Sequence, residues 1–392
     1  MEFNNETYRL TGINKISVMA VVICLIGIIA SGIGYFTDID QFLHSWLISF
    51  VFWVMLGVGG LFFGMIHHLT GANWSVVVRR LFENIMVVTP FMFIFAIPLI
   101  FNLDNLYSWS IPEVMHADHL LEGKEPFLND TFFVIRFVGY FVVWFILSRL
   151  LYNSSLKQDK GEAQIKRMRT ISAPGMILFA LSLTFAAFDW LMSLDAHWYS
   201  TIFGAYIFGG SVLSAMSFLT LFVFQMKRKN ILTNIITPEH YHDFGKLLFA
   251  FIIFWGYMAF SQYFLIWYGN IPEETVWFLE RWQGGWKTIT LMIVYGHFVI
   301  PFFYLFPQGV KRNLTALSIM AVWILAAHWL NLYWLVMPGF LHEHVHFSWM
   351  DVSTMMAMGG FFVAVFLYYT RSQPLVPVKD PGLGKSIKFV NH

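Results

Sequence analysis

The chain has 392 residues, of which 58% are hydrophobic and only 12% are charged. A soluble globular domain carries about 25% charged residues, so this composition excludes an ordinary soluble protein and indicates a polytopic membrane protein. The formal net charge of +1 argues neither for nor against nucleic acid, and we expect no nucleic acid among the partners. The one cysteine, Cys24, excludes a disulfide framework and an iron–sulfur cluster ligated by cysteines of this chain.

Ten apolar segments are long enough to cross a bilayer, which takes about 20 residues in a helix. We therefore expect an all-α integral membrane protein with ten transmembrane helices in a single polytopic domain. The segments lie at about 14–36, 42–68, 76–101, 128–152, 173–194, 199–226, 244–268, 286–306, 314–337 and 348–370. Pro90, Pro98 and Pro301 fall within spans and predict kinks.

Lysine and arginine residues are segregated between the two faces of the predicted membrane domain. All but four of the 24 fall on the face that holds both ends of the chain, and the four exceptions are Lys124, Arg136, Arg281 and Lys287. Cytoplasmic loops carry the excess of Lys and Arg in membrane proteins. We therefore expect both termini, including a C-terminal tail at 371–392, to be cytoplasmic.

A very short turn joins the fifth and sixth spans. Asp189 lies inside the apolar helix before it, and Asp195 and His197 lie at the mouth of the hairpin. A carboxylate within a bilayer costs several kcal/mol unless it faces a cavity or a partner, so Asp189 is a functional candidate. Ser182 and Ser193 share its helix face and could extend a proton path, although such serines often bond only their own helix backbone.

Other polar side chains within the spans are candidates for proton transfer. On the ninth span, His328 and Asn331 are three residues apart and share a helix face. Because the unperturbed pKa of histidine is about 6.5, His328 is suited to carry a proton. Glu83, which follows Arg79 and Arg80, could take up a proton from the cytoplasm or could simply pair with one of those arginines.

Four side chains have the types that bind the carbonyl groups of a quinone. They are Tyr257, Ser261 and Gln262 on the seventh span and His297 on the eighth. The same groups could equally satisfy one another's hydrogen bonds. His297 could also be a packing residue, or it could ligate a haem together with His328.

The loops on the outer side carry side chains suited to docking a partner, namely Glu273, Glu274, His342, His344 and His346. Alternate histidines can bind a transition metal. An exposed docking or proton-release loop is the preferred interpretation, and no metal site is expected. The cationic connection at 154–169 predicts contact with anionic lipid.

A faint internal repeat relates two hairpins of the chain. Asp189-Trp190-Leu191 followed by Gly209-Gly210 is echoed by Tyr333-Trp334-Leu335 followed by Gly359-Gly360. Transporters often place a site in each of two repeats, so a stand-alone secondary transporter is one alternative for the function. Short echoes also arise by chance in a chain rich in tryptophan.

Several motifs resemble the NrfD/polysulfide-reductase-type family of membrane subunits. They are SLDAHWYSTIFG at 193–204, KLLFAF at 246–251 and IWYGNIPEE at 266–274. Within this family the chain is most similar to the two such subunits of alternative complex III, a bacterial quinol:cytochrome c oxidoreductase, and HHLTGANW at 67–74 points to the second of the two. Ala196 stands where family members often have proline, and Asp195, His197, Glu273 and Glu274 match motif positions.

The resemblance implies a fold of two four-helix bundles, helices 2–5 at about 42–194 and helices 6–9 at about 199–337, flanked by helices 1 and 10. It also implies that this chain holds no redox centre itself. The haem c groups and iron–sulfur clusters would belong to partner subunits: c-type cytochromes and an iron–sulfur protein, beside an NrfD-like paralogue, with cytochrome oxidase as a further partner.

The expected location is the bacterial inner membrane, and the expected role is binding of menaquinone or its quinol, proton transfer, or both. Asp189, Asp195 and His197 would form one outer proton path. His328 and Asn331 would form a second, together with the loop that carries His342, His344 and His346, called here the histidine loop. The alternative within the same complex is a scaffold that only docks the outer redox subunits.

Overall fold

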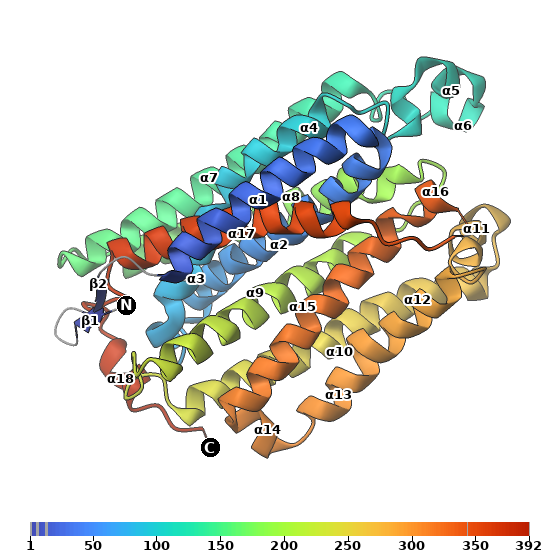
Figure 1. Cartoon of the computed structure of the whole chain (residues 1–392). Helices are drawn as coiled ribbons and strands as arrows, with labels where there is room; N and C mark the ends of the chain where they lie inside the picture. The colour runs from blue at the N-terminus through green and yellow to red at the C-terminus, as the bar shows by residue number, and fades with distance from the viewer. Residues whose placement is uncertain (1, 5–7, 12–14, 343, 392) are drawn as a thin grey trace.

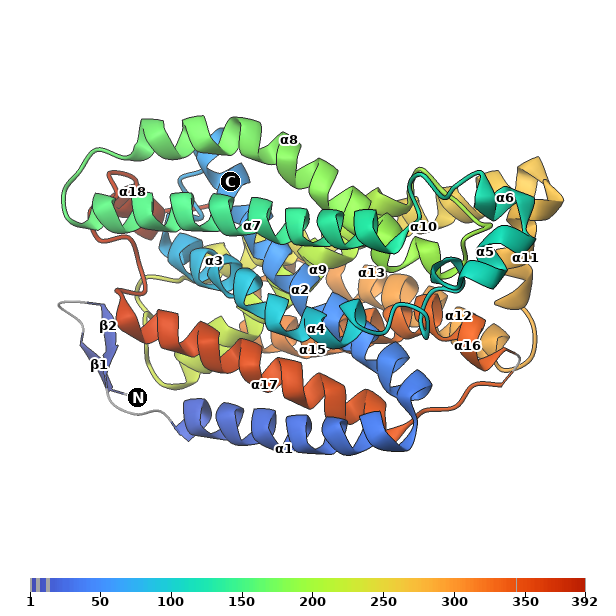
Figure 2. The ribbon, with the colours of Figure 1, turned by 90° about the horizontal axis from the view of Figure 1, so that it is seen from above.

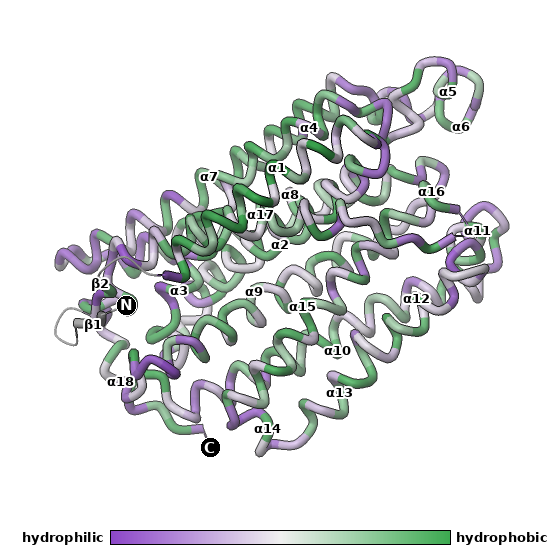
Figure 3. Tube along the Cα trace, viewed as in Figure 1, coloured by the Kyte–Doolittle hydropathy of each residue, from purple (hydrophilic) through white to green (hydrophobic). Residues whose placement is uncertain are grey.

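The computed structural model describes residues 2–4, 8–11, 15–342 and 344–391. The expected start of the first span, at residue 14, lies outside them. Within the described residues, 10 helical segments are long and apolar enough to cross a membrane. These segments run roughly side by side (Figure 1), with hydrophobic residues along their lengths and hydrophilic residues gathered toward two ends (Figure 3). The composition therefore predicted the class correctly: the chain is a multi-pass membrane protein.

The spans begin and end close to the expected residues, although several extend further at one end. They are α1 (Lys15–Thr37), α2 (Ile39–Thr70), α3 (Val76–Val88) continued by η1 (Thr89–Ala96) and α4 (Ile97–Ile100), α7 (Asp130–Asp159), α8 (Ile165–Trp190), α9 (Phe203–Arg228), α10 (Pro238–Gly269), α12 (Trp286–Ile293) continued by η4 (Val294–Val299) and α13 (Ile300–Leu305), α15 (Leu314–Val336) and α17 (Trp349–Ser372).

Short elements connect the spans. They are η2 (Ser108–Ser110), α5 (Pro112–Ala117), α6 (His119–Glu122), η3 (Met192–Leu194), α11 (Pro272–Glu280), α14 (Gln308–Arg312), α16 (Pro338–Leu341), α18 (Leu383–Ile387) and an antiparallel hairpin of β1 (Glu2–Asn4) and β2 (Arg9–Thr11). Both termini and α18 lie at one end of the molecule (Figures 1 and 2), together with α14 (Figure 1), and this end is called here the terminal end. The opposite end, with α5, α6, α11 and α16, is called the lid end.

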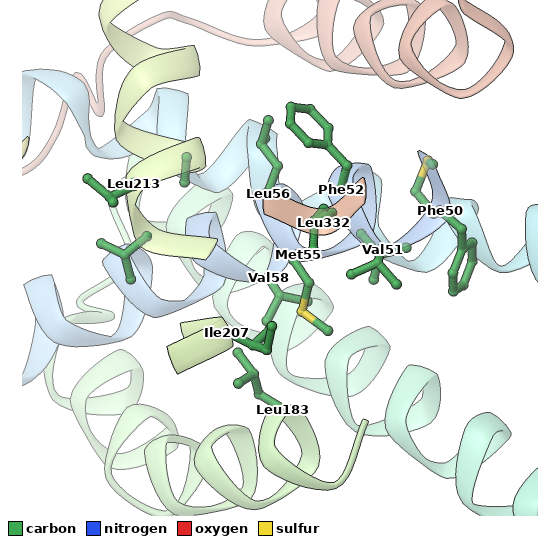
Figure 4. Packing of buried hydrophobic residues seen from close by; sticks show 14 of the residues in the cluster. Phe50, Val51, Phe52, Met55, Leu56, Val58, Leu183, Ile207, Leu213 and Leu332 are labelled. Atoms are coloured by element: carbon green, nitrogen blue, oxygen red, sulfur yellow. The ribbon is translucent and has the colours of Figure 1, made fainter. Parts of the chain in front are cut away.

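Helix α2 lies at the centre of the fold. It is buried over almost its whole length and packs against α3, α8, α9 and α17. Figure 4 shows Val58 of α2 close to Leu183 of α8 and Ile207 of α9. Asp38 caps the first turn of the helix, and Gly71, with φ +63°, ends it. The core is therefore built around one helix that carries hydrophobic residues on every face, as a wholly buried helix must.

Two groups of spans are named here for reference, one around α2 and one around α9. Helices α2, α3, α7 and α8 are called here the first helix set, in which α7 packs on α8 and α3 on α2. Helices α9, α10, α12, α13 and α15 are called the second helix set, in which α9 packs on both α10 and α15. The two sets are in extensive contact with each other, through α2 with α9 and α15 and through α8 with α9.

Helix α1 is a peripheral span that packs mainly along α17. Its remaining surface is apolar and exposed, up to 87% for Phe36, as expected of a face toward lipid. A Cβ atom at Gly27 would lie 2.2 Å from the backbone nitrogen of Ala357, so only glycine allows this approach of the two helices.

The eighth span differs from the continuous helix expected at 286–306. A π-helical segment, η4, separates α12 from α13 and carries His297. Pro301 has no N–H to donate to the carbonyl of His297 four residues earlier, so the α-helical pattern cannot continue unchanged. Pro90 likewise lies in the η1 segment of the third span. The expected irregularity at prolines is therefore present, and at His297 it takes a form that is frequent at functional sites.

The C-terminal segment is not a free tail but is folded onto the terminal end. The N–H of Leu375 donates to the carbonyl of Tyr8 at 2.9 Å, and Oγ of Ser386 donates to the carbonyl of Trp74 at 2.8 Å. Asp380 pairs with an arginine of α3. This segment, residues 373–391, is called here the C-terminal strap.

Candidate functional site

Asp189 forms a buried ion pair that the sequence analysis did not predict. Arg136 of α7 donates from Nε to Oδ2 at 2.8 Å and from Nη2 to Oδ1 at 2.9 Å. The hydroxyl of Tyr140 donates to Oδ2 at 2.6 Å. Both carboxylate oxygens are therefore bonded, and a bidentate arginine neutralises the charge.

The polar stripe on α8 is also occupied by local partners. Oγ of Ser182 accepts a hydrogen bond from Nε1 of Trp144 at 3.0 Å, and Oγ of Ser193 donates to the carbonyl of Asp189 at 2.6 Å. Arg136 additionally stacks on the ring of Phe127, 3.8 Å from its centroid. These contacts favour a structural role for Asp189 over proton transfer.

Asp195 and His197 lie in the turn after α8, where they bond to different partners. Oδ1 of Asp195 accepts from the N–H groups of His197 and Trp198 at 3.2 and 3.4 Å, which closes the turn. Nε2 of His197 lies 2.6 Å from Oδ2 of Asp118 in the loop between α5 and α6. This hydrogen bond lowers the pKa of Asp118. The hydrogen bond between His197 and Asp118 thereby links the turn after α8 to the short helices α5 and α6.

A cavity of about 360 Å³ opens beside this turn. Its lining includes Lys124, Asp195, Trp198 and Tyr199. Burial lowers the pKa of Lys124, whose Nζ donates to the carbonyl of Ala196. The cavity is therefore lined mostly by apolar side chains, with Lys124 and Asp195 as its charged residues.

Glu83 is buried at the terminal end inside a network of charges. Its Oε1 lies 3.0 Å from Nε of Arg79, and its Oε2 lies 3.2 Å from Nε of Arg80. Oγ of Ser155 also donates to Oε2, at 2.7 Å. Of the two interpretations of Glu83, proton uptake or an ion pair with an arginine, the structure contains the ion pair, and it involves both arginines.

The network continues beyond Glu83 to two further carboxylates. Arg79 pairs with Asp380 of the C-terminal strap, and Arg80 donates to Asp159 at 2.6 Å. A cavity of about 150 Å³ lies beside it, lined in part by Arg79 and His67. Three carboxylates and two guanidinium groups therefore hold α3, α7 and the strap together.

His297 and His328 lie beside each other in the core of the second helix set. Their exposed fractions are 0% and 2%, and their ring centroids are 5.8 Å apart. Trp255 of α10 packs on His297 with a centroid separation of 3.9 Å. On the other side, a Cβ atom at Gly210 of α9 would lie 2.3 Å from Cε1 of His328. The glycine therefore leaves the space that the histidine ring fills.

Several polar atoms of the two histidines and of the neighbouring Asn331 lack a hydrogen-bond partner among the described residues. Within the described part of the chain, both ring nitrogens of His297, Nδ1 of His328 and Nδ2 of Asn331 make no hydrogen bond. Oδ1 of Asn331 accepts from the hydroxyl of Tyr206. Buried polar atoms are nearly always paired in native proteins, so such a group marks a place where water or a transferred proton would be bound.

The serines of α9 differ from one another in whether their hydroxyl groups have a hydrogen-bond partner. Ser211 and Ser214 each donate to the carbonyl four residues earlier, at 2.9 and 2.8 Å, which is the packing interpretation of such serines. Oγ of Ser217, one turn further toward the terminal end, has no partner among the described residues.

Arg281, one of the four cations expected on the outer face, is buried at the lid end. It donates to the carbonyls of Trp277, Trp334 and Leu335, at 2.8, 3.3 and 3.2 Å. Its guanidinium lies 3.5 Å from the centroid of the Trp277 ring. Burial lowers the pKa of Arg281 to about 9, so it stays charged at neutral pH. It belongs to none of the ion pairs found among the described residues.

The four quinone candidates do not form one site. Tyr257 is 63% exposed, whereas Gln262 is buried and accepts from Oγ of Ser200 at 3.0 Å. Ser261 is half-buried, and His297 belongs with His328 instead. A haem between the two histidines does not fit either, because Trp255 and Gly210 already pack against their rings.

The predicted docking residues lie on the lid end with exposed side chains in most cases. Glu273, His342, His344 and His346 are exposed, and Glu274 is half-buried. The histidine loop is held through its backbone, since the Tyr333 hydroxyl donates to the carbonyl of His346 at 2.6 Å. No three His, Cys, Asp or Glu side chains of the described residues lie close enough together to hold a metal ion.

The comparisons with known proteins found no relative, so the resemblance to a family rests on the sequence motifs alone. No protein-family model matches the chain, and no curated protein matches it. The geometry of the buried histidines therefore has to carry the functional argument.

Proposed function

We propose that the chain is a membrane subunit of a bacterial quinol:cytochrome c oxidoreductase of the alternative complex III type, and that its second helix set transfers protons during quinol oxidation. The motif resemblance supports the choice of complex. The observation that carries the proton-transfer role is the buried pair of His297 and His328, whose ring nitrogens include three without a hydrogen-bond partner among the described residues.

Histidine is suited to this role because it binds and releases protons near neutral pH. With ring centroids 5.8 Å apart, a proton passes between His297 and His328 directly or through one water molecule. Asn331 and Tyr206, which are joined by a hydrogen bond, continue the row of polar groups about one turn further toward the lid end. On the terminal-end side, Ser217 of α9 supplies a hydroxyl group that has no partner among the described residues.

The proposed arrangement in the membrane follows the distribution of Lys and Arg. The terminal end would face the cytoplasm of a bacterial inner membrane, and the two helix sets would be the two four-helix bundles of the family. The lid end would face outward and dock the iron–sulfur protein and c-type cytochromes through Glu273, Glu274 and the exposed histidines.

The first helix set is assigned to assembly rather than to proton transfer. Asp189 and Glu83 are each neutralised by arginine, and replacing either partner of such a pair leaves an uncompensated buried charge. This observation favours the scaffold alternative for that half of the chain.

The assembly is tested by mild detergent extraction of the full-length chain through an affinity tag. We expect c-type haem in the visible spectrum of the eluate and cytochrome c reduction that depends on menaquinol. A colourless chain without partners or activity would contradict the assignment and favour the transporter.

The proton role is tested by His297→Phe and His328→Phe in the isolated complex reconstituted into vesicles. We expect fewer protons moved per electron with the subunit still assembled. Tyr295→Phe is the matched control, because it removes a hydroxyl group from an exposed position in the same span as His297. An unchanged proton-to-electron ratio in both histidine variants would remove the pair from the mechanism.

A further inference from the structure

We infer that Arg281 is an electrostatic barrier that closes the lid-end side of the His297–His328 pair to protons, so that at rest the pair exchanges protons only with the terminal end. The inference rests on the proposed proton-transfer role of the pair. It adds a direction to that role, and it assigns a function to a residue outside the predicted site.

The position of Arg281 follows from the order of groups on α15. His328 comes first, Asn331 follows three residues later, and the carbonyl of Leu335, which accepts from Arg281 at 3.2 Å, follows after four more. An α-helix rises about 1.5 Å per residue, so each step is roughly one turn toward the lid end. The guanidinium therefore bonds to α15 about two turns beyond His328, on the lid-end side of the pair.

Aromatic rings fill the space between Arg281 and the pair. Trp277, under the guanidinium, stacks on Trp198 at 4.2 Å. Tyr206 packs on Trp255 at 5.5 Å, and Trp255 packs on His297. Phe203 lies between the two groups, 5.8 Å from Trp198 and 6.1 Å from Tyr206. The surroundings are therefore of low polarity, in which the field of a charge is weakly screened.

The charge of Arg281 is also not cancelled locally. Its partners are backbone carbonyls, whereas Arg136 at the lid end of the first helix set is neutralised by Asp189. Glu280 and Asp195 act on it through space and raise its pKa, but neither forms an ion pair with it among the described residues. A fixed arginine of this kind excludes protons and other cations from membrane pores.

The size of the barrier follows from Coulomb's law. Two unit charges about 10 Å apart, at an effective dielectric constant of about 20, repel one another enough to slow proton passage by at least about tenfold. Removing the charge while keeping the bulk should therefore open a passive proton leak.

The experiment measures passive proton flux into vesicles that hold the purified full-length chain with its co-purifying partners. A potassium diffusion potential drives the flux, and a trapped pH-sensitive dye reports it. We expect Arg281→Met to raise the flux at least tenfold and Arg281→Lys, which keeps the charge but not the three-way bonding, to stay within about twofold of the parent. A leak of equal size in both variants would show that packing, not charge, seals this end, and would overturn the inference.

A second variant separates this inference from the proposed function. Adding His297→Phe to Arg281→Met should return the flux to the parent level, because the leak must run through the pair. A tight Arg281→Met protein would refute the barrier even if His297→Phe still lowered the proton-to-electron ratio. Arg281→Gln serves as an independent neutral variant, and a flux at the parent level in a folded Arg281→Gln protein would refute the barrier equally.

Discussion

Arg136 and Asp189, 53 residues apart in sequence, are joined by two hydrogen bonds of 2.8 and 2.9 Å between α7 and α8. Arg281 occupies the lid end of the second helix set without such a carboxylate. One set therefore ends in a neutral ion pair, and the other in an arginine that bonds to backbone carbonyls and forms no ion pair among the described residues. This asymmetry separates a structural half of the chain from a half built around buried histidines.

Asp189→Asn should destabilise the protein, because it leaves Arg136 charged and without an anionic partner. Removing one member of a buried pair costs about 3–5 kcal/mol. We expect a lower midpoint of thermal unfolding in detergent, followed by intrinsic fluorescence. The double variant Arg136→Met with Asp189→Leu should lose less, since no isolated charge remains; a loss as large as that of Asp189→Asn would argue against the ion pair as the cause.

Gly210→Ala should impair proton transfer without touching either histidine. The added methyl group would lie 2.3 Å from Cε1 of His328, so the ring has to move. We expect a lower proton-to-electron ratio in the reconstituted complex. Gly139→Ala on α7 is the matched control, because no atom lies within 4 Å of its Cβ position. Equal ratios in the two variants would mean that the position of the His328 ring is unimportant.

Asp380→Asn should loosen the C-terminal strap at the terminal end. The substitution removes the carboxylate that pairs with Arg79. We expect faster cleavage of the last 20 or so residues in limited proteolysis, measured as the rate of loss of a C-terminal tag. Lys388→Gln, at an exposed position of the same strap, should be cleaved at the parent rate. Identical rates for both would show that the ion pair does not hold the strap.

The link between Asp118 and His197 should respond to acid only at low pH. The His197 hydrogen bond lowers the pKa of Asp118 in the folded protein, so its contribution is fully present above the ordinary aspartate pKa of about 3.9 and is lost as the pH falls through the lower, folded value. We expect exchange protection at residues 112–122 to persist at pH 5 and to fall in His197→Ala at that pH. Protection that is already lost between pH 7 and 5 in the parent would contradict this link.

The spans could be predicted from sequence because a bilayer demands about 20 apolar residues per helix, and that signal is local. Helix α8 begins at Ile165 and α10 at Pro238, both earlier than expected, since residues beyond the hydrocarbon layer need not be apolar. The π-helical turn at His297 was signalled only by the nearby Pro301. The folding of the strap onto α3 had no local signal.

The candidate site was predicted in its residue types but not in its pairings. From the sequence, His297 was a quinone candidate and His328 a proton-transfer candidate, and the two were joined only in the haem alternative, because their separation along the chain hides their contact. Arg136 and Arg281 were missed as partners for the same reason. An arginine near a span end is normally an orientation signal, and only its burial shows a further role.

The most direct test of the proton-transfer claim is the number of protons moved per electron by the reconstituted complex, compared between the parent and the His297→Phe, His328→Phe double variant. We predict that menaquinol still reduces cytochrome c in the variant while the proton-to-electron ratio falls. A ratio equal to that of the parent, in a variant that is assembled and active, would contradict the account.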